Sequence, residues 1–291
     1  MIKTKLLLTA AGVPFERVDV PNVLPRPDLV SIGITYRRVP ILAVGKDIYC
    51  DSKVIFDVVL SKLAKKHVPT SPADQAWEQW GFNAFADTLG LAPHSLMTPE
   101  FVKDRQTIYP LLARADFNTL RESALADLHS RMDYLENTVL AQNKYIGGDA
   151  LSVADIQAIW GIRWDLHGAD SQPPGLGAGH ESAVDRKQFP KVWSLIDRLP
   201  IPQPKIISFD EAKAKIFEAG YLADVGGVWD LEPTGIEVGA NVTVDALGSE
   251  PYRHPVAGKL VATSKDEIVI EVPTGLRLHF PRQGQILRRA I

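Results

Sequence analysis

The pattern of apolar and polar positions changes twice along the chain, after about residue 70 and again near residue 225. In the first part, residues 3–11 carry the apolar spacing of a helix, and Gly12 is placed to end it. Residues 15–20 then alternate between apolar and polar side chains, as a half-buried strand does. A helix followed by a strand predicts an α/β segment at the start of the chain.

A β-hairpin leading into a helix is predicted next. Two short apolar runs, 39–44 and 46–50, are separated by Gly45, and a tight turn between such runs is typical of a hairpin. Asp51 and Ser52 follow, and both residue types are favoured at helix N-caps. Apolar residues recur behind them at helical spacing, so the helix is expected to begin directly after the second strand.

From about residue 73 to residue 200 the apolar positions take the period of helices. One stripe steps by three and four residues along a single helix face: Leu125, Leu128, Met132, Leu135 and Val139. Stripes of this kind, without alternating runs between them, predict a helix bundle.

The last part of the chain alternates in short runs separated by Gly and Pro. Runs within 242–246, 268–272 and 276–280 place apolar side chains at every second position. Several short strands at a spacing of roughly ten residues predict a small β-barrel or rolled sheet. The three patterns divide the chain into segments 1–68, 73–222 and 225–291.

Composition and charge exclude several classes of protein. The chain has 291 residues, of which 45% are hydrophobic and 23% charged, unlike disordered, collagenous or disulfide-stapled chains. Its formal charge is −3, and residues 225–291 hold seven Lys or Arg against eight Asp or Glu, so no nucleic acid is expected as a partner. No run approaches the roughly 18 apolar residues of a membrane-spanning helix, so no membrane is expected either. The single cysteine, Cys50, cannot form an internal disulfide, which indicates a reducing, cytoplasmic location.

The common signatures of metal and phosphate sites are absent from the sequence. The seven His residues have no ligand-like spacing, which predicts no metal.

Ser152 and Asp155 have the spacing of a capping box, in which the side chain of each residue bonds to the backbone amide of the other. We interpret this pair as a folding device without catalytic function.

Two motifs lie about 100 residues apart. The first is Tyr-Arg-Arg-Val-Pro-Ile-Leu at 36–42 with Asp51-Ser52, and the second is Gly-Gly-Asp-Ala-Leu-Ser-Val-Ala-Asp-Ile at 147–156. They resemble, respectively, the N-terminal domain of glutathione S-transferases and the capping motif of their helical domain. The resemblance covers about residues 1–200. It implies an α/β thioredoxin-like half-domain followed by an all-α helix bundle, with the small β-barrel-like domain behind them.

The resemblance also implies a glutathione site. The Val39–Pro40 bond is expected to be cis, with Val39 pairing with the cysteinyl backbone of glutathione as an added strand would. The amide and hydroxyl of Ser52 would receive the γ-glutamyl carboxylate, and Asp51 would face its ammonium group. Arg37 and Arg38 lie beside this site and would steer the anionic tripeptide. The alternative is that Asp51 or Ser52 is only a helix N-cap.

The sequence does not identify a catalytic residue. In glutathione transferases a Tyr, Ser or Cys just after the first strand activates the glutathione thiol, and this chain begins inside the helix that follows. The half-domain is therefore expected to lack its first strand. The function implied is conjugation of glutathione to a small-molecule electrophile, or a glutathione-dependent isomerisation. The alternative is a non-catalytic binding or scaffold protein that has lost the thiol-activating residue. Cys50 adjoins the site, but nothing in the sequence predicts a lowered pKa for it.

Residues 225–291 resemble a β extension found on some fungal glutathione-transferase-like proteins. Within it, His279 lies on the opposite side of its strand from Leu276, Leu278 and Phe280, and it is expected to be exposed. The family resemblance further implies a homodimer.

Overall fold

The computed structural model describes the whole chain except residues 1, 168–174, 223, 249, 251–252 and 291. The chain forms two compact units. The sheet unit contains residues 15–61 and 204–291, and the helical unit contains residues 2–14 and 62–203. Each unit thus combines segments far apart in the sequence. The division into 1–68, 73–222 and 225–291 stays a prediction.

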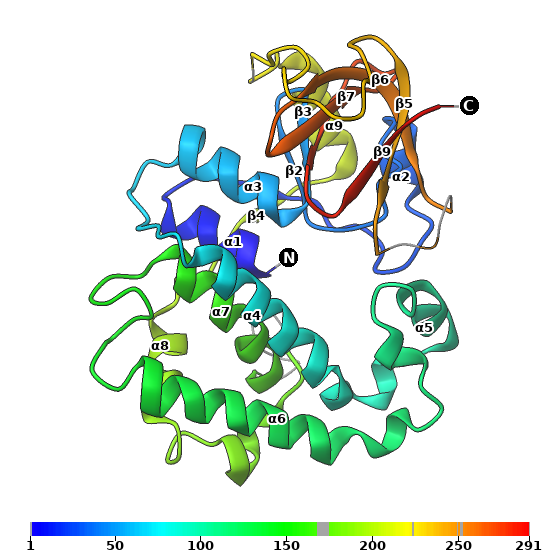
Figure 1. The fold of residues 1–291 in the computed structure, drawn as a ribbon. Helices are drawn as coiled ribbons and strands as arrows, with labels where there is room; N and C mark the ends of the chain where they lie inside the picture. Colours follow the sequence, from blue (N-terminus) through cyan, green and yellow to red (C-terminus); the bar gives the residue numbers. More distant parts are fainter. Residues whose placement is uncertain (1, 168–174, 223, 249, 251–252, 291) are drawn as a thin grey trace. The chain divides into compact units, whose positions relative to one another are not determined.

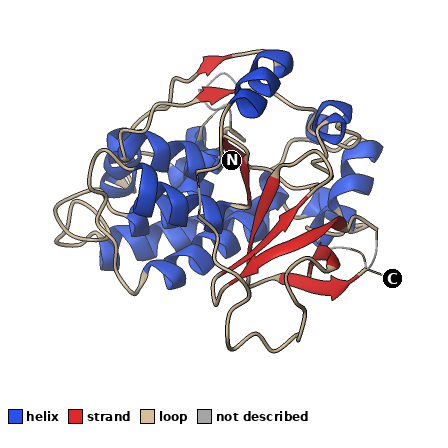
Figure 2. Ribbon diagram, turned by 90° about the horizontal axis from the view of Figure 1, so that it is seen from above, coloured by secondary structure: helices blue, strands red, loops and turns tan. Residues whose placement is uncertain are grey.

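The sheet unit is built on one seven-stranded sheet with the strand order β2-β3-β8-β7-β6-β5-β9 (Figure 1). Figure 2 shows its strands in red. The strands are β2 (Ile41–Val44), β3 (Asp47–Cys50), β5 (Asn241–Ala246), β6 (Val256–Thr263), β7 (Glu267–Glu271), β8 (Arg277–Pro281) and β9 (Gln285–Arg289). A separate parallel pair is formed by β1 (Glu16–Arg17) and β4 (Lys205–Ile206), and the helices of the unit are α2 (Pro27–Ser31), α3 (Ser52–Val58) and α9 (Phe209–Glu218).

The predicted hairpin is confirmed as the antiparallel pair β2–β3. Its turn is at Gly45, which has a φ of +58°. A Cβ at this position would lie 2.1 Å from the carbonyl oxygen of Gly220, so the turn has room only for glycine. Along its other edge, β3 pairs in parallel with β8 through residues 47–49 and 277–279. The C-terminal strands therefore continue the sheet that the hairpin begins.

The predicted small barrel at the C-terminus is not found. A barrel would require the last strand to pair back onto β8, but β9 pairs antiparallel with β5. The edge of β8 that such a closure would use is occupied by β3. Within the described residues the sheet stays open, with β2 at one end and β9 at the other. The alternation of the sequence located the strands but did not reveal their partners.

One apolar core holds the sheet unit together. Partly buried side chains of α9, namely Phe209, Ile216 and Phe217, pack against it. Its buried members come from residues 32–50 and 236–280: Ile32, Ile34, Tyr36, Ile48, Cys50, Ile236, Val242, Val244, Val256, Leu260, Ile268, Ile270, Val272, Leu276, Leu278 and Phe280. The residues of the hairpin and the C-terminal strands thus share one core.

The helical unit confirms the predicted bundle. Its longer helices are α1 (Ile2–Ala10), α4 (Asp74–Asp87), α5 (Pro99–Arg105), α6 (Arg121–Tyr134), α7 (Val153–Leu166) and α8 (Pro190–Arg198). Helices α4 and α7 pack side by side (Figure 1). A Cβ at Gly81 of α4 would lie 1.9 Å from the carbonyl oxygen of Gln157, so this approach depends on glycine. Among the helices in the described ranges, none is long and apolar enough to cross a membrane.

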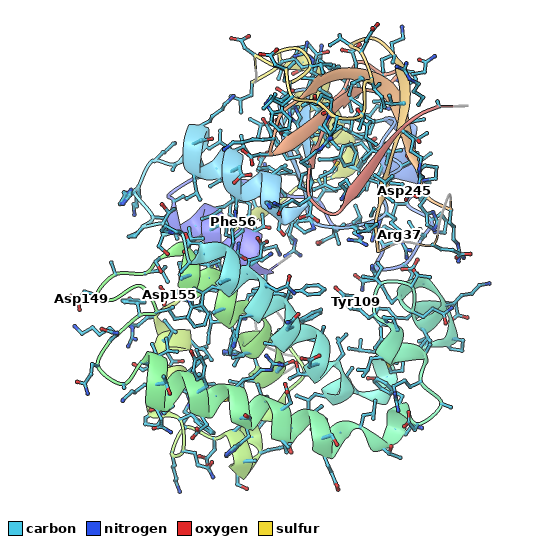
Figure 3. All side chains as sticks on the ribbon, in the orientation of Figure 1. Arg37, Phe56, Tyr109, Asp149, Asp155 and Asp245 are labelled. Atoms are coloured by element: carbon cyan, nitrogen blue, oxygen red, sulfur yellow. The ribbon has the colours of Figure 1, made fainter. Side chains whose placement is uncertain are left out.

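The capping box predicted at the start of α7 is present. The carboxylate of Asp155 accepts hydrogen bonds from the amide of Ser152 at 2.9 Å and from the Ser152 hydroxyl at 2.6 Å. Its other oxygen accepts from the amide of Ile146 at 2.6 Å. Asp155 is fully buried, whereas nearby Asp149 is exposed (Figure 3). The Asp155 side chain thus joins the loop at residue 146 to the first turn of α7.

Replacing Asp155 should destabilise the protein. The Asp155→Ala variant would leave two backbone amides without their carboxylate acceptor, and we expect a loss of about 2–4 kcal/mol in the free energy of unfolding. Asp149→Ala is the matched control, because it removes an exposed carboxylate from the same loop and should change stability by less than about 0.5 kcal/mol. Denaturant unfolding measures both variants, and equal losses would contradict the structural role given to Asp155.

Candidate functional site

The two predicted ligand-binding segments meet at one end of the β2–β3 hairpin. The register pairs Ile41 with Cys50, so the residues just before β2 and just after β3 come to the same end. These residues are Val39–Pro40 and Asp51–Ser52. The Val39–Pro40 peptide bond is cis, as expected. We call this place, residues 38–40 and 51–53, the hairpin corner.

Asp51 occupies an unusual backbone conformation at the hairpin corner. It is the N-cap of α3, and its Oδ1 accepts from the amide of Lys53 at 3.0 Å and from the hydroxyl of Ser52 at 3.3 Å. Its φ is 110°, a value that costs a non-glycine residue about 1–3 kcal/mol. The hydrogen bonds show that Asp51 caps α3, but helix capping alone does not require a φ of 110°. Strain of this kind is concentrated at binding and catalytic sites.

Three charged side chains at the hairpin corner have no ion-pair partner among the described residues: Asp51, Arg38 and Lys53. The Nε of Arg38 is buried without a hydrogen bond, and its Nη2 lies 3.3 Å from where a Cβ on Gly248 would be. The Nζ of Lys53 donates to the neutral amide oxygen of Gln283 at 2.5 Å. Within the part of the chain that the structure describes, none of these three charges therefore has a counter-charge in an ion pair.

Arg37 is placed differently from Arg38. Its side chain is only 4% exposed, and its carbonyl oxygen accepts a hydrogen bond of 2.6 Å from Nη1 of Arg26. Arg37 is thus part of the interior, whereas the side chain of Arg38 is only partly buried.

Cys50 and Tyr36, which adjoin the hairpin corner, are both buried. Burial, and then the charge of Asp51, raise the pKa of the Cys50 thiol well above its usual value, and its Sγ–H faces the carbonyl of Ile48 at 3.8 Å. Burial also raises the pKa of Tyr36, followed by the effects of Asp51 and Cys50, while its ring meets that of Phe280 edge to face at 5.6 Å. Near neutral pH both side chains are protonated.

The expectation that His279 is exposed is wrong. Its side chain is 1% exposed and bonds to Asp47 and Glu267 on the neighbouring strands. The alternation along the strand correctly placed His279 on the face opposite Leu278 and Phe280, but that face of β8 is also buried. Four of the five residues of β8 are buried because the strand lies inside the sheet, between β3 and β7. The pairing with β3 could not be read from residues 276–280 alone.

The candidate site contains no metal-binding group. Throughout the part of the chain that the structure describes, no cluster of three or more His, Cys, Asp or Glu residues is placed to hold a metal ion.

Two family models match separate segments of the chain. The glutathione S-transferase N-terminal domain matches residues 2–67, which include the hairpin corner, and a domain of unknown function (DUF7962) matches residues 88–202. The chain is also 23% identical over 218 residues to glutathione S-transferase 3 of Zea mays, covering 70% of this chain and 91% of that protein.

Structural comparison extends the likeness to nearly the whole chain. A glutathione-transferase-like protein from Pseudomonas syringae has a TM-score of 0.70 at 22% identity, covering 99% of this chain and 94% of that chain. A glutathione transferase homologue from Sulfitobacter, solved with bound glutathione, has a TM-score of 0.45 at 18% identity, covering 68% and 86% respectively. The N-terminal domain match, the curated relative and the shared fold agree, and the chain is a member of the glutathione S-transferase superfamily.

Proposed function

We propose that the protein binds glutathione at the hairpin corner and acts as a glutathione-transferase-like protein. The observation that carries this proposal is the unneutralised charge at the corner. Asp51, Arg38 and Lys53 lack ion-pair partners among the described residues, and glutathione brings one ammonium group and two carboxylates. A ligand with these charges would supply what the corner lacks.

Each part of the corner has a counterpart in the tripeptide. The Ser52 hydroxyl and the amides at the start of α3 can bind the γ-glutamyl carboxylate, and the Asp51 carboxylate can face the neighbouring ammonium group. Strand β2 is an end strand of the sheet within the described residues, so its outer edge can pair with an extended peptide backbone beginning at Val39. Arg38 is the cation that would steer the anionic ligand.

The reaction proposed for the bound ligand is nucleophilic attack by its thiolate. The sulfur forms a bond to the electrophilic carbon of a small molecule, and the displaced group leaves with its bonding electrons; in an isomerisation the same C–S bond forms and later breaks. Such chemistry needs a group that stabilises the thiolate. Cys50 and Tyr36 do not fit that role, because both side chains are buried in the core of the sheet unit.

The burial of Cys50 and Tyr36 favours a second candidate function, in which the protein binds glutathione without conjugating it. Free thiols have a pKa of about 8.5, so only a few per cent of an unassisted ligand would be thiolate near neutral pH. Conjugation of a generic aryl halide, measured with saturating glutathione, separates the two functions. Turnover above the solution rate supports a transferase, and binding without turnover supports the non-catalytic protein.

The proposal also includes a cytoplasmic location and a homodimer. Cys50 is the single cysteine of the chain and is a free, buried thiol, which suits a reducing compartment. The dimer rests on the family likeness, and light scattering of the purified chain measures it.

Removing the polar groups of the hairpin corner should weaken glutathione binding. In an Asp51→Asn, Ser52→Ala variant the Asn can still cap α3, while the charge that faces the ammonium group and the hydroxyl that faces the carboxylate are lost. We expect a loss of about 2–4 kcal/mol in the binding free energy, measured by calorimetry.

A second double variant, Asp57→Ala, Ser61→Ala, is the matched control for that experiment. It removes one Asp and one Ser from exposed positions further along the same helical segment and should leave the affinity unchanged. Unchanged affinity in the folded Asp51/Ser52 variant would remove the corner as the glutathione site.

Cys50 should be inert in the folded protein. Because its thiol is fully buried and its pKa is raised, a disulfide reagent should label it slowly under native conditions and rapidly in denaturant. Cys50→Ala should keep the glutathione affinity, and any conjugation activity, of the wild-type protein. Rapid native labelling together with loss of turnover in Cys50→Ala would instead identify Cys50 as a reactive residue.

A further inference from the structure

A buried histidine joins three strands of the sheet unit. His279 of β8 is 1% exposed, and its two ring nitrogens face two different carboxylates. Nε2 lies 2.9 Å from Oδ1 of Asp47 on β3, and Nδ1 lies 2.9 Å from Oε1 of Glu267 on β7. The cluster therefore crosses the sheet at the point where the hairpin pairs with the C-terminal strands.

The three groups can bond to one another only if each ring nitrogen meets an oxygen of matching donor or acceptor character. A neutral imidazole has one N–H donor, whereas an imidazolium has two, and ionised carboxylates only accept. Asp47 uses its other oxygen, Oδ2, to accept from the amide of Leu222 at 2.6 Å, so both of its oxygens face N–H groups. The side chain of Glu267 is 31% exposed, so it keeps contact with water. For both carboxylates to accept a hydrogen bond from one ring, that ring must be the doubly protonated imidazolium.

The groups around the His279 ring favour its positively charged form. Burial alone lowers the pKa of His279, but the hydrogen bonds to Asp47 and Glu267 outweigh burial and raise that pKa above its ordinary value. Tyr49 of β3 stacks on the ring with centroids 4.5 Å apart, and burial keeps this phenol protonated.

The neighbouring cations bind elsewhere. On β8 itself, the Arg277 guanidinium lies over the ring of Tyr221 at 3.8 Å and 3.9 Å from the carboxylate of Glu271. On α3, which packs against β8, Lys53 bonds to Gln283.

We propose that His279, as a buried imidazolium, is a proton-dependent lock that holds β3 of the hairpin to β8 and β7 of the C-terminal strands. The parallel joint between β3 and β8 consists of three residue pairs, at 47–49 and 277–279, and His279 is at one end of it. Loss of the ring proton removes one of the two donors. A fully buried Asp47 carboxylate, or Glu267, then faces an unprotonated nitrogen, and the joint opens to hydrate it.

The lock has a defined dependence on pH. A histidine with a raised folded-state pKa contributes stability that is complete below its unfolded value of about 6.5 and is lost as the pH rises through the folded value. The protein should therefore lose stability on the alkaline side of neutrality by an amount that depends on His279. This inference concerns the sheet alone and holds whether or not glutathione binds.

The direct test is NMR of the wild-type protein labelled with ¹⁵N in its histidines. At about pH 7.5, where a free imidazole is largely neutral, both ring nitrogens of His279 should remain protonated, and they should lose one proton only at higher pH. Glu267→Gln, which changes a partly exposed side chain, should shift this one signal and lower its titration midpoint. A neutral His279 ring at about pH 7.5 would overturn the proposal.

The second test is thermal unfolding as a function of pH. Wild-type protein should show a falling melting temperature above neutral pH, and His279→Gln should flatten that fall. His129→Gln is the matched control, because His129 faces the carbonyl oxygen of Ala183 instead of a carboxylate and should keep the wild-type profile. An unchanged alkaline profile in a folded His279→Gln protein would also overturn the lock. If that variant does not fold, the NMR titration of the wild-type and Glu267→Gln proteins decides.

Discussion

The parallel pairing of β3 with β8 is the constraint on which the sheet unit depends. A two-stranded hairpin of four-residue strands is at best marginally stable in water, and it needs a third strand and an apolar face. β8 supplies the third strand, and the shared core supplies the apolar face. The C-terminal strands are therefore structural support for the hairpin, and the hairpin in turn sets the positions of residues 39–40 and 51–52. In this way a segment more than 200 residues later in the chain stabilises the candidate site.

The local elements could be predicted from sequence because their signals are local. Gly12 ends α1 at a φ of +67°, Gly45 forms the hairpin turn, and Asp51 caps the next helix. Each effect acts within a few residues, so a spacing or a residue type reveals it. The order of the strands in the sheet, in contrast, has no such local signal. Nothing in the alternation of residues 276–280 indicates that an edge of that strand pairs with residues 47–49, and the barrel prediction rested only on the spacing of the short strands.

The candidate site was predictable to the same extent. A two-strand register brings the residues before β2 next to those after β3, so Val39–Pro40 and Asp51–Ser52 could be placed together from the hairpin alone. The contacts of Arg38 with the segment at Gly248, and of Lys53 with Gln283, could not be predicted. They join residues about 200 positions apart, and they depend on the sheet continuing from β3 into β8. The burial of Arg37 beside an otherwise similar Arg38 was missed for the same reason.

The two acidic residues that flank β3 show how one strand can serve both stability and binding. Asp47, at its start, is fully buried, and both oxygens are occupied by N–H groups of the protein, one of them on His279. Asp51, just beyond its end, is partly exposed, and among the described residues its Oδ1 accepts from the Lys53 amide and the Ser52 hydroxyl, neither of which carries a charge. A buried carboxylate must have its charge balanced within the fold, because no solvent does so. A partly exposed one can keep its charge for a ligand. The difference separates the carboxylate proposed to hold the sheet together from the one proposed to bind the ammonium group of glutathione.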